Sequence, residues 1–238
     1  MGFFDKKKCS ICGGDAGRVF VKKLEDGLLC KECTGKLSPW FTGRRHSSVA
    51  EIEEQLAYRE ANKAAVAVFS PTRTWGGNTK VYLDEAAGKF IVTKSSNWRD
   101  ENPDVIAVSD VLGVQMEAEE HRWEEKYRDS EGKEVSYNPP RFRGEVDYYV
   151  EISVNTTYFD EIRFKLNDRT ISDVDFATRE ATVRIADDLK ATLMGNREAV
   201  LDAAAAAAAP KMAAQCKTCG ATTTPTATGC CEYCGCPL

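Results

Sequence analysis

Residues 146–155 read VDYYVEISVN, and their alternation of apolar and polar side chains determines the fold class. An apolar residue at every second position is the pattern of a strand with one buried face. The same alternation recurs at residues 112–116 and 162–166, and short apolar runs at residues 81–83 and 90–92 flank a glycine-containing turn. Successive short strands with tight connections predict an antiparallel β domain.

A second hairpin and a closing helix are expected around these strands. Apolar runs at residues 123–127 and 135–137 flank the turn sequence DSEG at residues 129–132. After the strands, the pattern predicts a helix from about Ser172 to Met194. Its expected buried face has apolar residues at four-residue intervals: Ala177, Ala181, Ile185, Leu189 and Leu193. Strands followed by one closing helix have the element order of a pleckstrin-homology-type barrel.

Helical patterns also lie outside the strand region. SVAE at residues 48–51 has capping-box spacing, and good helix formers continue to about Val68. The apolar stripe expected on this helix is Ile52, Leu56 and Val66. Gly195-Asn196 is expected to interrupt the later helix. Seven alanines, residues 203–209, then precede Pro210 and predict a helical or fraying linker.

All ten cysteines lie near the two ends of the chain, and none occurs in residues 37–215. Paired CxxC motifs in a chain without a signal peptide indicate metal binding rather than disulfides. The N-terminal pairs are CSIC and CKEC, which supply Cys9, Cys12, Cys30 and Cys33. Two residues between cysteines let both sulfurs contact one ion at about 2.3 Å. Gly13 permits the positive-φ turn that directs backbone N–H groups toward the thiolates.

The residues between the N-terminal pairs favour a specific local fold. Residues 19–24 and 28–29 flank the turn sequence EDG and predict a hairpin that brings the pairs together. Residues 31–37 are expected to begin a helix directly from the second pair. Knuckle, hairpin, knuckle and helix is a treble-clef-like arrangement. Four thiolates in this arrangement predict one structural zinc ion.

The C-terminal cysteines predict a second zinc module, of ribbon type. Two CxxCG motifs pair, and the expected ligands are Cys216, Cys219, Cys231 and Cys234. A module of about 24 residues is too small for an apolar core, so metal must supply most of its folding energy. Cys230 and Cys236 remain over. Alternative ligands, a redox pair and spare thiols are three interpretations of these two, and spare thiols are favoured.

Charge is distributed unevenly along the chain. The net charge of −5 and the pI near 5.3 argue against a protein wholly devoted to nucleic acid. Residues 1–45 nevertheless hold ten Lys and Arg against five Asp and Glu. The candidate anion or nucleic-acid contacts are Lys22, Lys23, Arg44 and Arg45. Trp40-Phe41 nearby suits either base stacking or, as favoured, packing under the zinc module.

Catalysis, nucleotide binding and membrane insertion lack support in the sequence. All-cysteine metal sites are closed, whereas catalytic zinc keeps an open position. His46 and His121 are the only histidines, and both are expected at the surface. Phosphate-binding glycine motifs are absent. An acidic cluster at residues 117–125 is interpreted as a solvated patch rather than a cation site. Without a long apolar run or a signal peptide, the expected location is the cytoplasm.

The N-terminal cysteine region resembles a known bacterial family. The resemblance rests on CSICGG at residues 9–14, KLEDG at residues 23–27, LCKEC at residues 29–33 and KLSP at residues 36–39. These motifs are similar to the domain of unknown function 4428, over roughly residues 1–60. The resemblance implies zinc bound by Cys9, Cys12, Cys30 and Cys33 in a family without an established activity. GCCEYCG near the C-terminus is similar to generic bacterial zinc ribbons.

These observations predict an α+β protein with a zinc module near each end. The expected segments are an N-terminal zinc module at 1–45, a helix and connector at 46–78, a β domain with its helix at 79–198, an Ala-rich linker at 199–214 and a zinc ribbon at 215–238. The expected function is a non-catalytic adaptor or scaffold that binds proteins. The alternatives are nucleic-acid binding through the basic N-terminal module and membrane-surface or lipid binding by a pleckstrin-homology-like domain.

Overall fold

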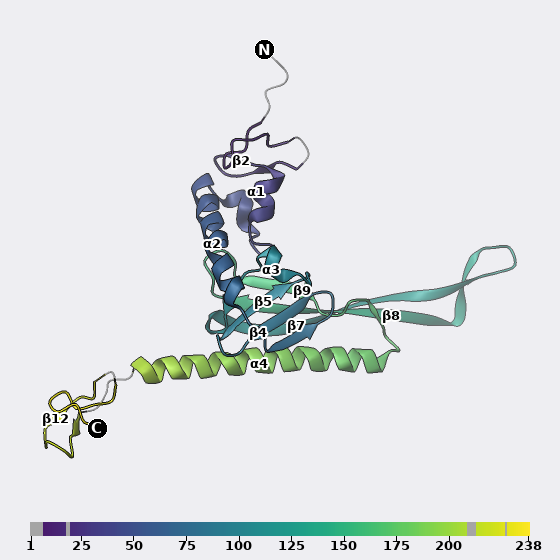
Figure 1. The fold of residues 1–238 in the computed structure, drawn as a ribbon. Helices are drawn as coiled ribbons and strands as arrows, with labels where there is room; N and C mark the ends of the chain where they lie inside the picture. Colours follow the sequence, from purple (N-terminus) through teal and green to yellow (C-terminus); the bar gives the residue numbers. More distant parts are fainter. Residues whose placement is uncertain (1–6, 18–19, 209–212, 227) are drawn as a thin grey trace, which may run out of the picture. The chain divides into compact units, whose positions relative to one another are not determined.

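The computed structural model describes residues 7–17, 20–208, 213–226 and 228–238. The chain divides into two compact units, Met1–Glu198 and Ala199–Leu238, which are described separately. The predicted fold class is confirmed at the level of a mixed α+β protein with antiparallel sheets and a long C-terminal helix (Figure 1). A four-cysteine cluster lies toward each end of the chain.

Two four-stranded antiparallel sheets make up the centre of the first unit. The first has the order β3-β4-β5-β6, with bounds Arg73–Gly76, Lys80–Asp84, Lys89–Thr93 and Ile106–Ala107. The second has the order β10-β8-β7, with β9 also paired to β8. Its bounds are Val111–Arg128 for β7, Glu134–Val154 for β8, Glu161–Lys165 for β9 and Ile171–Ser172 for β10. Short helices α3 (Trp98–Glu101) and η2 (Val108–Asp110) connect β5 to β7.

The alternating segment at residues 146–155 behaves as predicted. Its apolar members are all 5 % exposed or less and face one core: Val146, Tyr148, Val150, Ile152 and Val154. The first sheet contributes Leu83 and Phe90 to the same core, and the cross-strand register sets these two residues opposite each other. The two-residue strands β6 and β10 were not predicted, and neither was β3, which falls in the segment assigned to a connector. The four residues of β3 are too few to show a period, although Trp75 buries in the core.

Strands β7 and β8 are far longer than the sequence predicts. The apolar runs at residues 112–116 and 123–127 join into the 18 residues of β7, and those at 135–137 and 146–154 join into the 21 residues of β8. The predicted hairpin is confirmed, because Tyr127 faces Val135 across the two strands. The intervening polar residues continue the strands because every one of them pairs across the ladder except at two irregularities.

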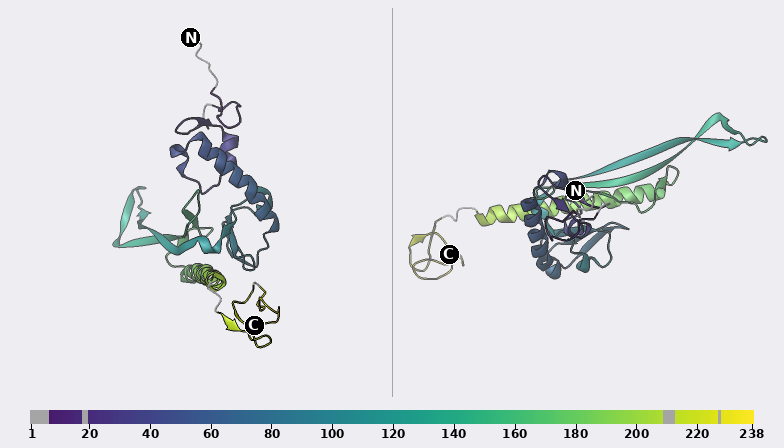
Figure 2. Two further views of the ribbon diagram at one scale, coloured as in Figure 1. Left: turned by 90° about the vertical axis from the view of Figure 1, so that its left-hand side faces the viewer. Right: turned by 90° about the horizontal axis from the view of Figure 1, so that it is seen from above.

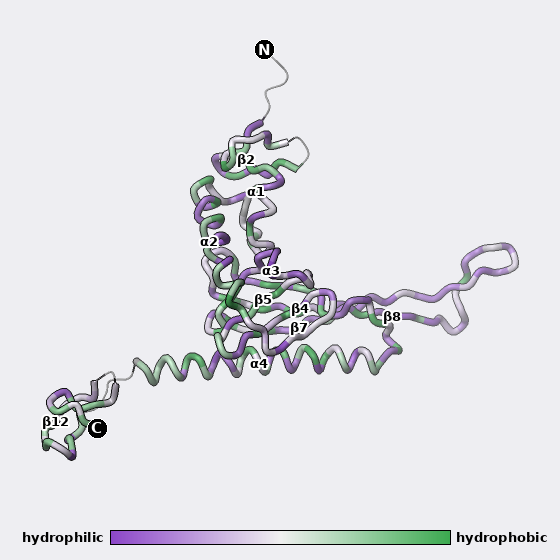
Figure 3. The backbone as a smooth tube through the Cα atoms, in the orientation of Figure 1, coloured by the Kyte–Doolittle hydropathy of each residue, from purple (hydrophilic) through white to green (hydrophobic). Residues whose placement is uncertain are grey.

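Beyond the core, β7 and β8 continue as a two-stranded arm, defined as residues 119–145. Both faces of the arm are mostly exposed, and Figure 2 shows it projecting from the sheets. Figure 3 shows the corresponding contrast between the hydrophilic arm and the hydrophobic strands of the core. Four residues of β8, Tyr137 to Pro140, have no partner in β7, because Glu125 pairs with Arg141 and the next residue pairs with Ser136. They form a large bulge in the arm.

Helix α4 spans Phe176–Ala208 and corrects three predictions. It starts four residues later than expected, at Phe176. It continues through Gly195 and Asn196, because one glycine in a helix costs only about 1 kcal/mol and good helix formers flank it. The buried face is also shifted, since residues spaced strictly by four drift around a helix with 3.6 residues per turn. The buried residues are Thr182, Ala186, Leu189 and Leu193, whereas Ala177, Ala181 and Ile185 are exposed.

The N-terminal part of the first unit contains a small hairpin, two α-helices and a short 3-10 helix. Their bounds are Lys22–Lys23 for β1, Leu28–Leu29 for β2, Lys31–Lys36 for α1, Gly43–His46 for the 3-10 helix η1 and Val49–Val68 for α2. The predicted hairpin and the helix from the second cysteine pair are confirmed within the described residues. The capping box of α2 is confirmed too, because Ser48 and Glu51 each accept a hydrogen bond from the backbone of the other.

The face of α2 toward the β domain is polar rather than apolar. Between Ile52 and Val66, the buried residues are Gln55, Arg59 and Asn62. Arg59 donates to Asp104 over 2.8 Å and to the Lys36 carbonyl oxygen over 3.3 Å. The Ser38 hydroxyl donates to the same carboxylate over 2.7 Å. This buried network therefore joins the segment after α1, helix α2 and the loop before β6.

Aromatic contacts strengthen the same junction. Tyr158, in the loop between β8 and β9, packs edge-on against Phe41 with ring centroids 6.4 Å apart. It also lies 5.1 Å from the ring of Tyr58 on α2. Trp40 packs against the β core, while Phe41 belongs to the core of the cysteine module. The two aromatic residues considered for base stacking are thus engaged in packing.

The second unit contains the end of α4 and two short paired strands, β11 (Ala214–Gln215) and β12 (Thr222–Thr223). Residues 203–208 of the alanine run continue α4, in agreement with the helical interpretation, and Ala209 and Pro210 lie outside the described residues. Among the helices that the structure describes, none combines the length and the apolar composition needed to cross a membrane.

Candidate metal centres

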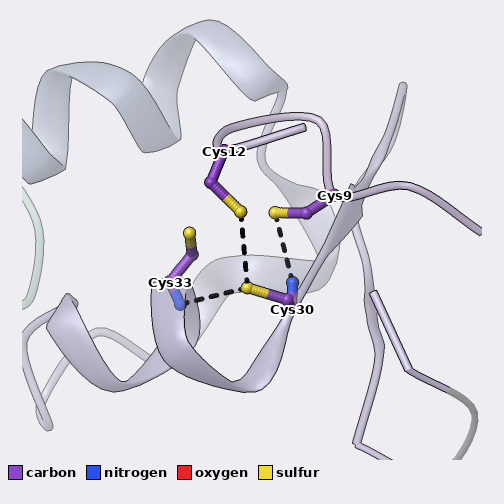
Figure 4. A group of neighbouring side chains, drawn as sticks. All are labelled: Cys9, Cys12, Cys30 and Cys33. Atoms are coloured by element: carbon purple, nitrogen blue, oxygen red, sulfur yellow. Dashed lines mark hydrogen bonds between the residues drawn. The ribbon is translucent and has the colours of Figure 1, made fainter. Parts of the chain in front are cut away.

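The first candidate metal centre is formed by Cys9, Cys12, Cys30 and Cys33. Their sulfur atoms all lie within 4.8 Å of one another. Figure 4 shows the four side chains converging from a loop and from the start of α1. Cys9, Cys30 and Cys33 are buried, and Cys12 is exposed at one side of the cluster. The structure therefore brings together all four cysteines that the spacing predicts.

Local backbone geometry explains this convergence. In the first knuckle the Gly13 N–H donates to the Cys9 carbonyl over 2.9 Å, and Gly13 has a φ of 69°, which glycine adopts readily. The second pair is arranged differently, because Cys30 is the N-cap of α1. The Cys33 N–H donates to Cys30 Sγ over 3.4 Å, and the Cys30 N–H donates to Cys9 Sγ over 3.3 Å. The positive-φ turn at Gly13 is confirmed, and the N–H groups that face sulfur atoms in these contacts are those of Cys30 and Cys33.

The second candidate centre is formed by Cys216, Cys219, Cys231 and Cys234, whose sulfurs also lie within 4.8 Å of one another. Its two knuckles repeat the geometry of the first one. Gly220 donates to the Cys216 carbonyl and Gly235 to the Cys231 carbonyl, both over 2.8 Å. Their φ angles are 73° and 70°. Three CxxCG motifs in this chain therefore share one turn, which orients two thiols toward a common point.

The sulfur separations fit a tetrahedral metal ion. The distances are 3.8 Å between Cys12 and Cys30, 3.6 Å between Cys216 and Cys234, and 3.7 Å between Cys219 and Cys231. Zinc–sulfur bonds of about 2.3 Å at tetrahedral angles place neighbouring sulfurs about 3.8 Å apart. A disulfide would require about 2.05 Å. The donor sets are therefore suited to a thiophilic divalent ion held by four ligands.

Hydrogen bonds from the backbone favour ionisation of one thiol in each cluster. Burial opposes ionisation of Cys9, but N–H groups of Cys12, Cys30 and Ile11 outweigh it and lower the pKa of this thiol to about 6. N–H groups of Cys219 and Thr218 lower the pKa of Cys216 to about 6. Burial and the neighbouring sulfurs raise the pKa of Cys33. A bound cation would offset that repulsion, because thiolates are the metal-binding form.

The remaining cysteines and the histidines lie outside both clusters. Cys230 and Cys236 are half-buried free thiols and belong to neither four-sulfur set. His121 is exposed on β7. His46 is exposed at the end of η1 and was expected to be an ordinary surface residue. Within the part of the chain that the structure describes, no histidine accompanies either cluster.

A basic groove lies in the same N-terminal module as the first centre. It has a volume of about 770 Å³ and lies between β1 and η1. Its lining residues are Val21, Lys22, Lys23, Leu24, Thr42, Arg45 and His46. Three of the four predicted anion contacts are thus brought together, while the side chain of Arg44 lies outside the described residues. Lys22, Lys23 and Arg45 have no ion pair among the described residues.

The predicted acidic patch is largely neutralised by arginines. Arg163 on β9 contacts Glu117 and Glu119, at 3.2 and 2.6 Å. Two further pairs are Arg179–Glu120 at 3.2 Å and Arg143–Glu125 at 2.9 Å. Acidic residues cluster here because β7 extends beyond the core, where its exposed faces need polar side chains. Three aromatic residues of the arm, Trp123, Tyr127 and Phe142, are exposed and were not predicted to be, although Trp123 and Tyr127 lie in a predicted strand.

Comparison with known proteins is informative for the N-terminal segment alone. Residues 7–55 match the model of a family described as a domain of unknown function, DUF4428. The matched segment contains the first candidate centre, the basic groove and the first turns of α2. No curated protein and no solved structure matches the chain. Residues 7–55 are a DUF4428 domain, and they carry the first four-cysteine centre.

Proposed function

We propose that this chain is a non-catalytic adaptor protein with two structural zinc ions, one in each four-cysteine centre. The observation that carries the proposal is the closure of both donor sets. Four thiolates complete a tetrahedral coordination sphere, so no position remains for a substrate or a reactive water. The thiols must stay reduced to bind metal, which supports a location in the cytoplasm.

Finer features of the fold support the same function. The hairpin and helix around the first centre suit a treble-clef-like module, and the repeated knuckles of the second suit a zinc ribbon. Two packed antiparallel sheets with α4 against their core suit a pleckstrin-homology-like domain, a fold that hosts many binding functions. The buried network around Arg59 holds the first module rigidly on the β domain, which favours a scaffold role.

Metal stoichiometry tests the zinc assignment. Native mass spectrometry of the reduced full chain should show two zinc ions. Cys12→Ser and Cys219→Ser should each lose one ion, because three ligands bind zinc far less tightly. The matched controls are Cys230→Ser and Cys236→Ser, which should keep both ions. Retention of two ions in Cys12→Ser, or loss of one in Cys230→Ser, contradicts the assignment.

Affinity capture from a bacterial lysate tests the adaptor role. The full chain is used as bait beside a variant whose arm is shortened by joining Arg122 to Gly144, two facing residues. Proteins retained by the full chain in preference to an unrelated zinc protein support the role. Recovery of the same background with both baits argues against it.

A second candidate function, binding of nucleic acid through the DUF4428 domain, is favoured by the basic groove. Unpaired cations along one groove suit a phosphate backbone, and such binding weakens steeply as salt rises. Anisotropy with a labelled single-stranded oligonucleotide measures it. Exchanging Lys22, Lys23 and Arg45 for Glu should abolish binding, whereas Lys133→Glu at the arm tip should not. Equal affinity for both variants would remove this candidate.

A further inference from the structure

The outer edge of β7 is a free strand edge over its whole length. In the second sheet β8 pairs with β7 on one side and with β9 and β10 on the other, and no described strand pairs with the far side of β7. Although β8 is bulged between Ser136 and Arg141, residues 113–128 of β7 pair without a skipped residue. A regular edge of this length is a template for another strand.

Charged side chains usually protect such an edge from pairing, because a second copy would meet like charges. The order of charges along β7 does not give this protection, because a second copy would not meet like charges. Around Trp123 the sequence is Glu120-His121-Arg122-Trp123-Glu124-Glu125-Lys126. Acidic and basic positions exchange places when this segment is read backward through Trp123. Two copies running antiparallel are therefore complementary.

We propose that two copies of this chain pair through the β7 edges of their arms, with a two-fold axis at Trp123. A symmetric pair requires a surface complementary to itself. With the axis at Trp123, Arg122 of each copy faces Glu124 of the other, and Glu120 faces Lys126. His121 faces Glu125 in the same arrangement. The two arms then form one continuous four-stranded ribbon.

The register is selective. Moving the axis by one residue to Arg122 places Glu120 opposite Glu124, and moving it to Glu124 places that carboxylate opposite its own copy. Like charges directly opposite each other on neighbouring strands are destabilising. Trp123, which is 44 % exposed in the single chain, would cover the same residue of the other copy in the favoured register. An aromatic pair at the centre adds to the cross-strand stabilisation.

Three of the charged groups concerned are available for pairing, whereas Glu120 already contacts Arg179 and Glu125 already contacts Arg143. Arg122, Glu124 and Lys126 have no ion pair among the described residues. Arg122 stacks over the ring of Phe142 at 4.6 Å, which leaves its guanidinium nitrogens free to meet a carboxylate. Arg143 and Glu125 pair across the two strands of the arm at 2.9 Å.

Charge reversal tests this pairing with the metal-loaded full chain. In Arg122→Glu and in Glu124→Arg, each of two symmetric pairs becomes repulsive, so the dimer Kd should rise by about tenfold or more. An equimolar mixture of the two variants restores complementarity and should form a heterodimer. Native mass spectrometry identifies the heterodimer by its mass. The double variant should dimerise like the unaltered chain, and Glu131→Arg at the arm tip is the control that should not change the Kd.

Sedimentation velocity of the unaltered chain completes the test. A dimer that weakens at high salt is expected, because exposed charge pairs are screened. A chain that stays monomeric at about 100 μM overturns the proposal, since pairing of this extent should then be populated. A dimer that both single variants preserve also overturns it, because the contact would then lie elsewhere. Circular dichroism confirms that the variants fold.

Discussion

At the scale of single residues, the buried pair of Arg59 and Asp104 is the most consequential contact outside the metal centres. The side chains are 8 % and 0 % exposed. Burial raises the pKa of Asp104, against the opposing effects of the Arg59 guanidinium and the Ser38 hydroxyl. A buried ion of this kind is tolerated only while its partner is present.

Replacement of Arg59 by Met should therefore destabilise the protein by about 3 kcal/mol, since it leaves an unpaired buried carboxylate. The raised pKa of Asp104 rises further, so the carboxyl group becomes neutral as the pH falls and the loss shrinks. Urea unfolding of the variant and the unaltered chain should show a larger difference at pH 8 than at pH 5.5. Lys63→Met, which removes an exposed pair on the same helix, should cost less than about 0.5 kcal/mol.

This pair also shows where prediction from sequence ended at the residue scale. The eight clustered cysteines were predictable because a metal site needs fixed spacing and few residue types. Arg59, Asn62 and Asp104 were not, because polar residues on a helix ordinarily face water and their partners lie over 40 positions away. Periodicity of apolar residues therefore located Ile52 and Val66 but missed the buried positions between them.

At the scale of elements, the attachment of α4 to the first sheet depends on Asp188. Its carboxylate accepts a hydrogen bond from the Trp75 indole over 2.6 Å and from Arg73 over 2.9 Å. The Trp75 N–H and then the Arg73 charge lower the pKa of Asp188. A lowered carboxyl pKa stabilises the fold at pH values above the ordinary Asp value, and this contribution is lost as the pH falls through the lowered pKa.

Asp188→Asn should consequently destabilise the protein by about 1 kcal/mol at pH 7, since the charged acceptor is partly exposed. The difference from the unaltered chain should diminish as the pH falls from about 4 through the lowered pKa of Asp188, because the carboxyl group then becomes neutral like the amide. Thermal unfolding at the two pH values measures it. Asp187→Asn is the control, because this neighbouring carboxylate has no hydrogen bond or ion pair among the described contacts. An equal loss of stability in both variants would argue that Asp188 does not attach α4 to the first sheet.

Because α4 is not interrupted at Gly195, a second prediction follows at this scale. Gly195 lies within the helix, and a Cβ at this position would meet no atom within 4 Å. Gly195→Ala should thus stabilise the protein by about 0.5–1 kcal/mol. Gly220→Ala should instead destabilise the second metal centre, because Gly220 has a φ of 73°. Chemical denaturation and zinc competition measure the two effects. A loss of stability in Gly195→Ala would indicate a helix break there.

Element boundaries were less predictable than element types. The short apolar runs of β7 and β8 predicted that these segments are strands but not how long the strands are. The polar arm between the runs has no buried face, so its sequence shows no alternation of apolar and polar residues. Helix α4 was predicted to end too early, before Gly195-Asn196. The helix-breaking tendency of these two residues is weaker than the summed helix propensity of the alanines that follow them. At the ends of these elements, local sequence preference and the packed structure favour different boundaries.

At the scale of the whole molecule, the two metal centres should differ in what their loss does. No described residue of the second unit belongs to an apolar core cluster, whereas the first unit has its own packed sheets. Chelation should unfold residues 216–236 and leave the β domain folded. Hydrogen exchange should show fast exchange in that segment and continued protection of β8 at residues 146–154. Protection of both regions after complete zinc removal would show that metal does not hold the second unit.

Both cysteine sets are local in the chain, and this has a consequence for biosynthesis. Each spans fewer than thirty positions, from Cys9 to Cys33 and from Cys216 to Cys234, while the β core packs together residues from Trp75 to Leu193. During translation, N-terminal segments can fold as soon as they leave the ribosome. If the first centre binds zinc as proposed, the DUF4428 domain can therefore acquire the ion while β7 and β8 are still being synthesised. Zinc supply to the nascent chain, rather than to the finished protein, would then govern how efficiently the first module forms.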